Sequence, residues 1–133
     1  MKVSVIGAGS WGTALAHLLG TAGNDVMLWA RKPEVCEGIN ALHRNPRYLV
    51  DSSVSERVRA SNDYETVLRG SQAVVIVTPS SIMRDVACDI RPFVSEDTPI
   101  IICSKGVEAG TGLLPVQVFE QELGNASRLA ALT

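Results

Sequence analysis

A glycine-rich turn near the N-terminus carries the clearest chemical signal in the sequence. Residues 7–12 read Gly-Ala-Gly-Ser-Trp-Gly, the pattern G-x-G-x-x-G, directly after an apolar run and directly before a helical pattern. In this setting Gly7 permits a tight turn, Gly9 lets the backbone approach a pyrophosphate, and Gly12 allows close packing of helix on strand. Unpaired N–H groups at the helix N-terminus suit phosphates. The placement favours a dinucleotide site over a structural turn with incidental glycines.

The residues after the second apolar run bear on the choice of cofactor. Sites specific for NAD usually carry Asp or Glu about 20 residues beyond the glycines, bonded to the ribose hydroxyls. Arg31 occupies that position here, and Lys32 follows it. A guanidinium makes paired hydrogen bonds to a 2′-phosphate, and an ammonium adds positive charge. The pair favours NADP over NAD, and the alternative is that both are solvated charges on a loop.

Two further strand ends contribute candidate residues. Thr78-Pro79-Ser80 follows one apolar run, and the proline stops the strand and leaves its backbone beside the expected cofactor groove. For Ser80 we expect a helix-capping role more than a catalytic one. Lys105, within Ser-Lys-Gly at the end of the next strand, suits a carbonyl or phosphate oxygen. Its position alone gives equal weight to a solvated surface lysine.

Strand-like and helix-like segments alternate along the whole chain. Strands are expected at 2–6, 25–30, 57–60, 73–77 and 99–103, with one more beginning at 129–132. Helices are expected after the glycines as far as Gly23, at 33–42, at 62–70 with Asn62 and Glu65 as a capping box, around 82–90, and within 110–123. Residues 45–55 look irregular. Repeated strand-helix-strand units predict one α/β domain over 1–133, a Rossmann-type, doubly wound, mainly parallel sheet with helices on both faces.

Composition excludes several other classes. The 133 residues are 46% hydrophobic with a formal net charge of −2, and Lys and Arg are scattered, so neither nucleic acid nor an anionic membrane is an expected partner. No apolar stretch is long enough for a membrane span or signal peptide. Cys36, Cys88 and Cys103 form an odd set without CxxC spacing, which indicates reduced thiols in a cytoplasmic protein, with Cys103 in a packing role. His17 and His43 read as structural or solvated, and no metal-ligand cluster is visible.

The motifs together resemble a known family. Residues 6–16 are similar to the opening of bacterial NAD(P)-dependent glycerol-3-phosphate dehydrogenases, and four later stretches agree in order and spacing: 28–31, 45–49, 77–80 and 104–106. The resemblance spans essentially the whole chain. Trp11 after the glycines, joined to Ser-Lys-Gly after the fifth strand, makes it more specific than the glycine motif. After Tyr48-Leu49 the family has proline where this chain has Val50.

The resemblance implies both an activity and a set of roles. Family members interconvert dihydroxyacetone phosphate and sn-glycerol 3-phosphate, the backbone of phospholipids, by hydride transfer with nicotinamide. By motif, the dinucleotide contacts are Ser10, Trp11, Arg31, Lys32, Tyr48 and Lys105. Lys105 also contacts substrate and stabilises negative charge on its oxygen.

The resemblance also implies that the family continues beyond this chain. Its members run past residue 133 into a helical domain that carries a second lysine, the proton donor and acceptor. We therefore expect a truncated N-terminal domain that binds NADPH but turns over little substrate. Apolar surface left uncovered makes a homo-oligomer plausible.

Three alternatives stay open at this point. Related dehydrogenases act on hydroxy acids, ketopantoate or nucleotide sugars, although Trp11 and Lys105 together argue against them. A nucleotide-binding or regulatory module without chemistry of its own is a second alternative. A non-redox Rossmann protein such as a methyltransferase is a third, which NADPH binding without affinity for S-adenosylmethionine would exclude.

Overall fold

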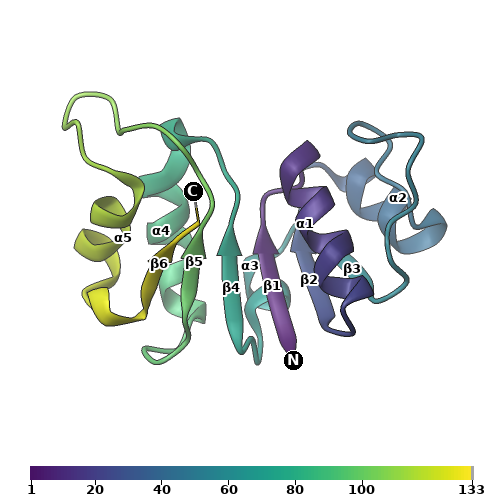
Figure 1. Cartoon of the computed structure of the whole chain (residues 1–133), viewed down its shortest axis with the longest axis horizontal. Coiled ribbons are helices and arrows are strands. Elements are labelled where there is room, and N and C mark those ends of the chain that lie inside the picture. Colours follow the sequence, from purple (N-terminus) through teal and green to yellow (C-terminus); the bar gives the residue numbers. More distant parts are fainter. Residues whose placement is uncertain (133) are drawn as a thin grey trace.

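The computed structural model, which describes residues 1–132, is built on one six-stranded parallel sheet (Figure 1). Its strands are β1 (Lys2–Ile6), β2 (Asp25–Trp29), β3 (Val58–Ser61), β4 (Ala73–Ile76), β5 (Ile100–Ile102) and β6 (Leu129–Ala131). Neighbouring strands follow the order β3-β2-β1-β4-β5-β6, and every pair is parallel. The order reverses between β1 and β4, which is where doubly wound sheets bind their ligands.

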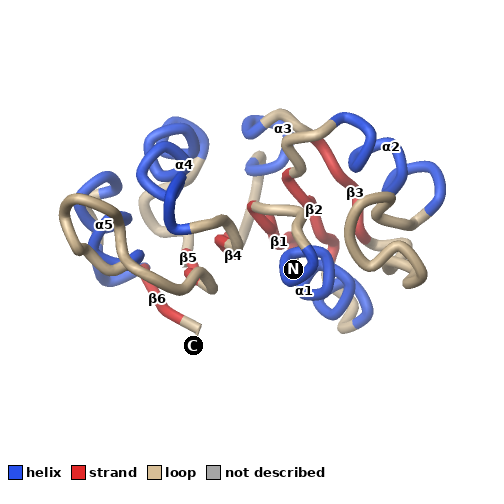
Figure 2. The backbone as a smooth tube through the Cα atoms, turned by 90° about the horizontal axis from the view of Figure 1, so that it is seen from above, coloured by secondary structure: helices blue, strands red, loops and turns tan. Residues whose placement is uncertain are grey.

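Helices cover both faces of the sheet. They are α1 (Ser10–Thr21), α2 (Pro33–Leu42), α3 (Tyr64–Leu68), α4 (Met83–Ile90) and α5 (Pro115–Leu123), with short 3₁₀ turns η1 (Ser80–Ile82), η2 (Arg91–Phe93) and η3 (Ala126–Arg128). Figure 2 shows α1 on one side of the sheet and α3 and α4 on the other. Right-handed crossovers impose this division, because the chain moves outward from β1 first in one direction and then in the other.

Two apolar clusters fill the space between the sheet and its helices. One joins the strands to Ala16 of α1 and to Val35 and Ile39 of α2. The other joins them to α3, α4 and Phe119 of α5. All four residues of β4 are buried and alternate between the two clusters, as expected for a central parallel strand covered on both faces. The predicted Rossmann-type fold is confirmed.

The predicted helices and strands are all present, and only their first and last residues differ slightly from the prediction. Each expected strand is present, with bounds that differ by no more than one residue at either end. Residues 45–55 form neither helix nor strand, as predicted. No helix within residues 1–132 combines the length and the apolar character needed to cross a membrane.

Two predicted helix caps are wrong. Asp63, not Asn62, caps α3: its Oδ2 accepts a hydrogen bond of 2.8 Å from the backbone N–H of Thr66, because the extended backbone continues one residue further than expected. Ser80 makes no capping hydrogen bond. The chain enters the 3₁₀ turn η1 after Pro79, so α4 begins only at Met83, beyond the reach of Ser80.

The cysteines and histidines behave largely as predicted. All three cysteines are unpaired, and Cys103 packs in the buried cluster beneath α1, where burial raises the pKa of its thiol. His17 is structural, because its Nδ1 accepts a hydrogen bond of 3.1 Å from the N–H of Ser55. His43 ends α2 in a left-handed conformation with φ of 49°. Within residues 1–132 no three His, Cys, Asp or Glu side chains gather closely enough to hold a metal ion.

Candidate functional site

A groove of about 570 Å³ lies at the carboxyl ends of β1, β2, β4 and β5. It sits at the point where the strand order reverses. Its walls include every predicted site residue except Lys105: Gly7, Gly9, Ser10, Trp11, Gly12, Arg31, Lys32, Tyr48 and Pro79. Segments far apart in the sequence therefore meet around one open space, as expected for residues that follow the ends of parallel strands.

The glycine-rich turn forms the centre of the groove. A Cβ on Gly7, whose φ is +118°, would lie 2.5 Å from the carbonyl oxygen of Val77, and a Cβ on Gly12 would lie 1.8 Å from that of Gly7. Both glycines are thus required by close backbone contacts. A Cβ on Gly9 would meet nothing within 4 Å. The space above Gly9 belongs to the groove and is open to a ligand.

The N-terminus of α1 points its unused backbone donors at this space. The N–H of Thr13 makes the first helical bond, 2.9 Å to the carbonyl oxygen of Gly9, so the N–H groups of Ser10, Trp11 and Gly12 are not used by the helix. The first turn contains no acidic side chain, and no side chain caps it. The partial positive charge at this end of α1 is therefore available to an anion.

Asn45 joins the glycine-rich turn to the segment of the groove wall that carries Arg47 and Tyr48. It is completely buried. Its Nδ2 donates hydrogen bonds to the carbonyl oxygen of Ala8 at 3.0 Å and to Oγ1 of Thr13 at 2.8 Å. Its Oδ1 accepts from the N–H groups of Arg47 at 3.0 Å and Tyr48 at 3.1 Å. One side chain thus fixes the position of Tyr48 relative to the turn. Asn45 was not predicted as a site residue.

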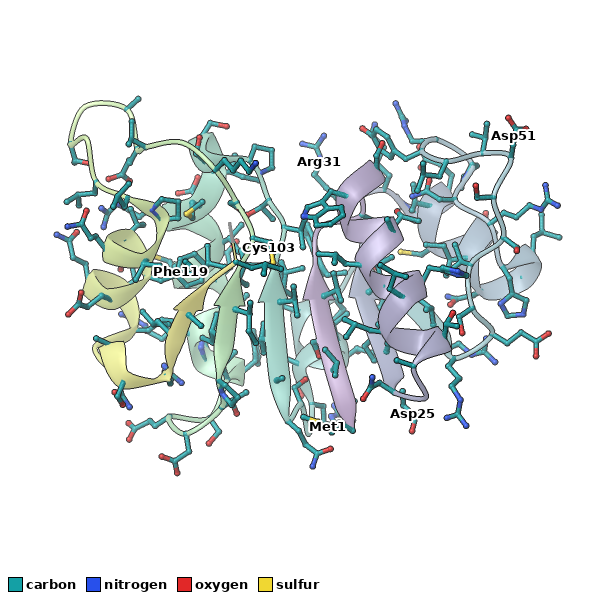
Figure 3. All side chains as sticks on the ribbon, in the orientation of Figure 1. Met1, Asp25, Arg31, Asp51, Cys103 and Phe119 are labelled. Atoms are coloured by element: carbon teal, nitrogen blue, oxygen red, sulfur yellow. The ribbon has the colours of Figure 1, made fainter. Side chains whose placement is uncertain are left out.

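Basic side chains gather at the β2 end of the groove. Arg31 and Lys32 line it, and Figure 3 shows Arg31 beyond the carboxyl end of the sheet, reaching away from the core. Arg47 lines the groove as well and forms a 3.0 Å ion pair with Glu34. A backbone hydrogen bond, helped by Arg47, lowers the pKa of the Glu34 carboxyl. Arg47 was not predicted as a site residue, although it stands beside Tyr48 in the stretch 45–49 that supports the resemblance.

Aromatic side chains shape the remaining walls. Trp29 stacks on Tyr64 with ring centroids 4.5 Å apart, and its Nε1 donates a 3.2 Å hydrogen bond to the carbonyl oxygen of Asn62. Burial raises the pKa of Tyr64 to about 12, so its phenol stays neutral. Trp11, in contrast, is 52% exposed at the groove. The groove thus offers one fixed and one accessible indole.

Lys105 lies just outside the groove. Its neighbour Ser104 lines the groove and donates a 2.6 Å hydrogen bond from Oγ to the carbonyl oxygen of Thr78. Lys105 itself is exposed and follows Ser104 into the long connection between β5 and α5. Lys105 thus adjoins the groove through Ser104, one residue beyond its wall, and we call this position the mouth of the groove.

The sheet order, the glycine turn and the open helix N-terminus define a dinucleotide-binding domain of the Rossmann type. Comparison with known proteins identifies its family. The family model described as the N-terminus of NAD-dependent glycerol-3-phosphate dehydrogenase matches residues 2–133, and the chain belongs to this family. The resemblance inferred from the motifs is confirmed.

Individual relatives agree with the family model. The glycerol-3-phosphate dehydrogenase (NAD(P)+) of Myxococcus xanthus is 45% identical over 120 residues, which make up 90% of this chain and 36% of that protein. The enzyme of the same name from Nitratidesulfovibrio vulgaris is 43% identical and is covered to 41%. The crystal structure of glycerol-3-phosphate dehydrogenase from Coxiella burnetii superimposes with a TM-score of 0.86 at 33% identity, over 93% of this chain and 38% of that one. The chain thus spans roughly two fifths of the length of its relatives.

Proposed function

We propose that residues 1–133 form the NAD(P)-binding part of an sn-glycerol-3-phosphate dehydrogenase, a cytoplasmic enzyme that converts dihydroxyacetone phosphate and NAD(P)H to glycerol 3-phosphate. The observation that supports this most strongly is the open space above Gly9, bordered by the unused N–H groups at the start of α1. Family membership supports the proposed identity of the substrate. When bound, the nicotinamide supplies a hydride to C2 of the ketone, whose oxygen takes up a proton.

Each predicted site residue then has a physical role. The N–H groups of Ser10, Trp11 and Gly12 bind the pyrophosphate at the helix N-terminus, where they need no rearrangement. Tyr48 and Pro79 both line the groove and contact the dinucleotide. Lys105, at the mouth of the groove, contacts the nicotinamide end of the dinucleotide and stabilises negative charge on the substrate oxygen.

The basic end of the groove favours NADP over NAD in this proposal. A carboxylate that bonds ribose hydroxyls is replaced by Arg31 at the end of β2, and Lys32 and Arg47 stand beside it. Three cations at one end of the groove suit the two negative charges of a 2′-phosphate. Glu34, the acidic neighbour, is held by Arg47 in an ion pair.

The proposal is tested by titrating the chain with NADPH and NADH, before and after Arg31→Asp. We expect tighter binding of NADPH, and a reversal of that order in the variant, because a charge-assisted hydrogen bond is worth about 1.5–3 kcal/mol. Arg57→Asp is the matched control, since Arg57 pairs with Asp25 at the amino end of the sheet, away from the groove. If the unmodified chain binds neither nucleotide, the proposal is wrong.

Self-association is a separate part of the proposal. Large apolar side chains are exposed on α1, after β6 and in the β5–α5 connection: Leu18, Leu132, Val107 and Leu114 are each more than half exposed. Side chains of this kind favour contact between protein surfaces. We propose that the chain forms a homo-oligomer. Sedimentation over a range of concentrations tests this, and a monomer at every concentration contradicts it.

A further inference from the structure

The connection between β5 and α5 begins at the groove and ends on the outer helices. It carries Lys105 near its start and runs past α4 before it reaches α5 (Figure 1). Lys105 makes no hydrogen bond or ion pair through its side chain with any residue in the described range 1–132. Its place at the groove therefore depends on what holds the backbone on either side of it.

On the groove side the connection is anchored directly. Ser104 Oγ donates to the carbonyl oxygen of Thr78, immediately before Lys105. Immediately after it, Gly106 has a φ of +102° and packs against Ser80, so closely that a Cβ there would lie 3.1 Å from the Ser80 Oγ. These two contacts fix the start of the connection to the segment that follows β4.

On the far side the anchor is Arg84, in the first turn of α4. Its Nε donates to Oε1 of Glu108 at 2.7 Å and its Nη2 donates to Oε2 at 2.8 Å, a paired arrangement on one carboxylate. Its Nη1 donates to Oε1 of Glu122 on α5 at 2.6 Å. The three side chains are only 17–32% exposed. Paired guanidinium–carboxylate contacts of this geometry are among the strongest and most directional in proteins.

Glu108 also holds the rest of the connection, through hydrogen bonds to the residues that follow it. Its N–H donates to the carbonyl oxygen of Leu113 at 2.8 Å, and its own carbonyl oxygen accepts from the N–H of Gly112 at 2.9 Å. Thr111 Oγ1 donates to Glu108 Oε2 at 2.5 Å. Residues 108–113 therefore form a closed turn fixed to α4 at one carboxylate. Only Gly106 and Val107 lie between Glu108 and Lys105 in the sequence.

We propose that Arg84 is a positioning residue for Lys105: by holding Glu108, it keeps the Lys105 segment fixed at the mouth of the groove before a ligand arrives. The inference rests on the proposed function, in which Lys105 contacts the dinucleotide. A segment that is already ordered loses less conformational freedom on binding, so the anchor raises affinity without touching the ligand.

The test is a double-mutant cycle on NADPH affinity with Arg84→Lys, Lys105→Ala and the combined variant. Lysine keeps the charge but cannot make the paired contact. We expect Lys105→Ala to weaken NADPH binding about 10-fold and Arg84→Lys about 5-fold. The combined variant should bind within about 2-fold of Lys105→Ala, because Arg84 then has no lysine to position. Glu108→Gln should weaken NADPH binding as much as Arg84→Lys does. Agreement between the two variants shows that the effect does not come from a folding defect in one of them.

Controls separate this inference from the proposed function. Arg69→Lys, which alters an exposed ion pair with Glu65 on α3, should leave affinity unchanged. Two outcomes overturn the inference and leave the proposed function standing. One is wild-type NADPH affinity in both Arg84→Lys and Glu108→Gln. The other is a combined variant whose affinity is weakened by the product of the two single effects. Wild-type affinity in Lys105→Ala refutes the role of Lys105 and the inference with it. Absence of NADPH binding by the unmodified chain refutes the proposed function as well.

Discussion

The Nδ2 of Asn45 lies 3.0 Å from the carbonyl oxygen of Ala8, in the middle of the glycine-rich turn. The same amide holds the backbone of Tyr48 through its Oδ1. Two walls of the groove, at Ala8 and Tyr48, are thus held by one buried side chain, which lies 37 residues from Ala8 in the sequence. Because every hydrogen-bonding position used by this amide faces a backbone or hydroxyl group, no other residue type can replace it without leaving a buried group unpaired.

Asn45→Ala should therefore lower both stability and affinity. We expect a loss of about 2–3 kcal/mol in the free energy of unfolding in urea, from buried polar groups left without partners, and weaker NADPH binding because Tyr48 is released. Asn40→Ala is a close control: Asn40 bonds both the N–H and the carbonyl oxygen of Ala60 at 2.8 Å, but at the β3 edge away from the groove. It should lower stability while NADPH affinity stays normal. Normal affinity in Asn45→Ala contradicts the proposed coupling.

Gly9 and Gly12 should respond to alanine in opposite ways. A Cβ at Gly12 would lie 1.8 Å from the Gly7 carbonyl oxygen, so Gly12→Ala should destabilise the fold by several kcal/mol, as overpacking does. A Cβ at Gly9 would meet nothing within 4 Å of protein, so Gly9→Ala should leave the thermal midpoint almost unchanged. The new methyl group would instead occupy the space for the pyrophosphate. NADPH affinity that survives Gly9→Ala would show that the ligand does not approach this turn.

The contact between Arg84 and Glu108 should make stability depend on pH in the acid range. The hydrogen bonds from Arg84 lower the pKa of Glu108 from 4.5 to about 2. A carboxyl whose pKa is lower in the folded protein contributes stability above its unfolded pKa, and that contribution is lost as the pH falls toward the folded value. The wild-type chain should therefore exceed Glu108→Gln in stability by a constant margin from pH 7 to about 5, which shrinks between about 4.5 and 2. Urea unfolding of both proteins at several pH values measures this margin. A stability margin that does not change with pH contradicts the lowered pKa of Glu108.

Local patterns in the sequence were sufficient to predict the framework of this domain. Unbroken apolar runs such as Ala73–Ile76 identify buried strands, and the glycines between a strand and a helix locate the turn. These signals are local, because each apolar run and the spacing of the glycines lie within a few consecutive residues. The helix caps were harder to predict from the sequence. Asn62 and Asp63 are both good cap residues, and only the backbone conformation decides between them.

The long-range polar contacts of the site could not be predicted in this way. Asn45 reads in sequence as one polar residue in an irregular stretch, and its partners Ala8 and Thr13 lie more than 30 residues away. Arg84 and Glu108 are likewise separated by 24 residues, and neither stands in a recognisable motif. Such contacts depend on how the strands and helices are brought together, so they become visible only once the fold is known.

Residues 1–133 assayed alone should bind NADPH and yet reduce dihydroxyacetone phosphate hardly at all. The chain covers 36% of the length of the Myxococcus xanthus enzyme, and the family resemblance assigns proton transfer to a lysine outside the matched region. General acid–base catalysis alone is worth about 10²–10⁴-fold in rate, and the family resemblance places most contacts to the substrate phosphate outside these residues as well. Loss of NADPH absorbance at high protein concentration measures the rate, with the Myxococcus xanthus enzyme as the active control. A rate within about 10-fold of that control would show that residues 1–133 contain a complete proton-transfer system, for which Lys105 would be the first residue to test.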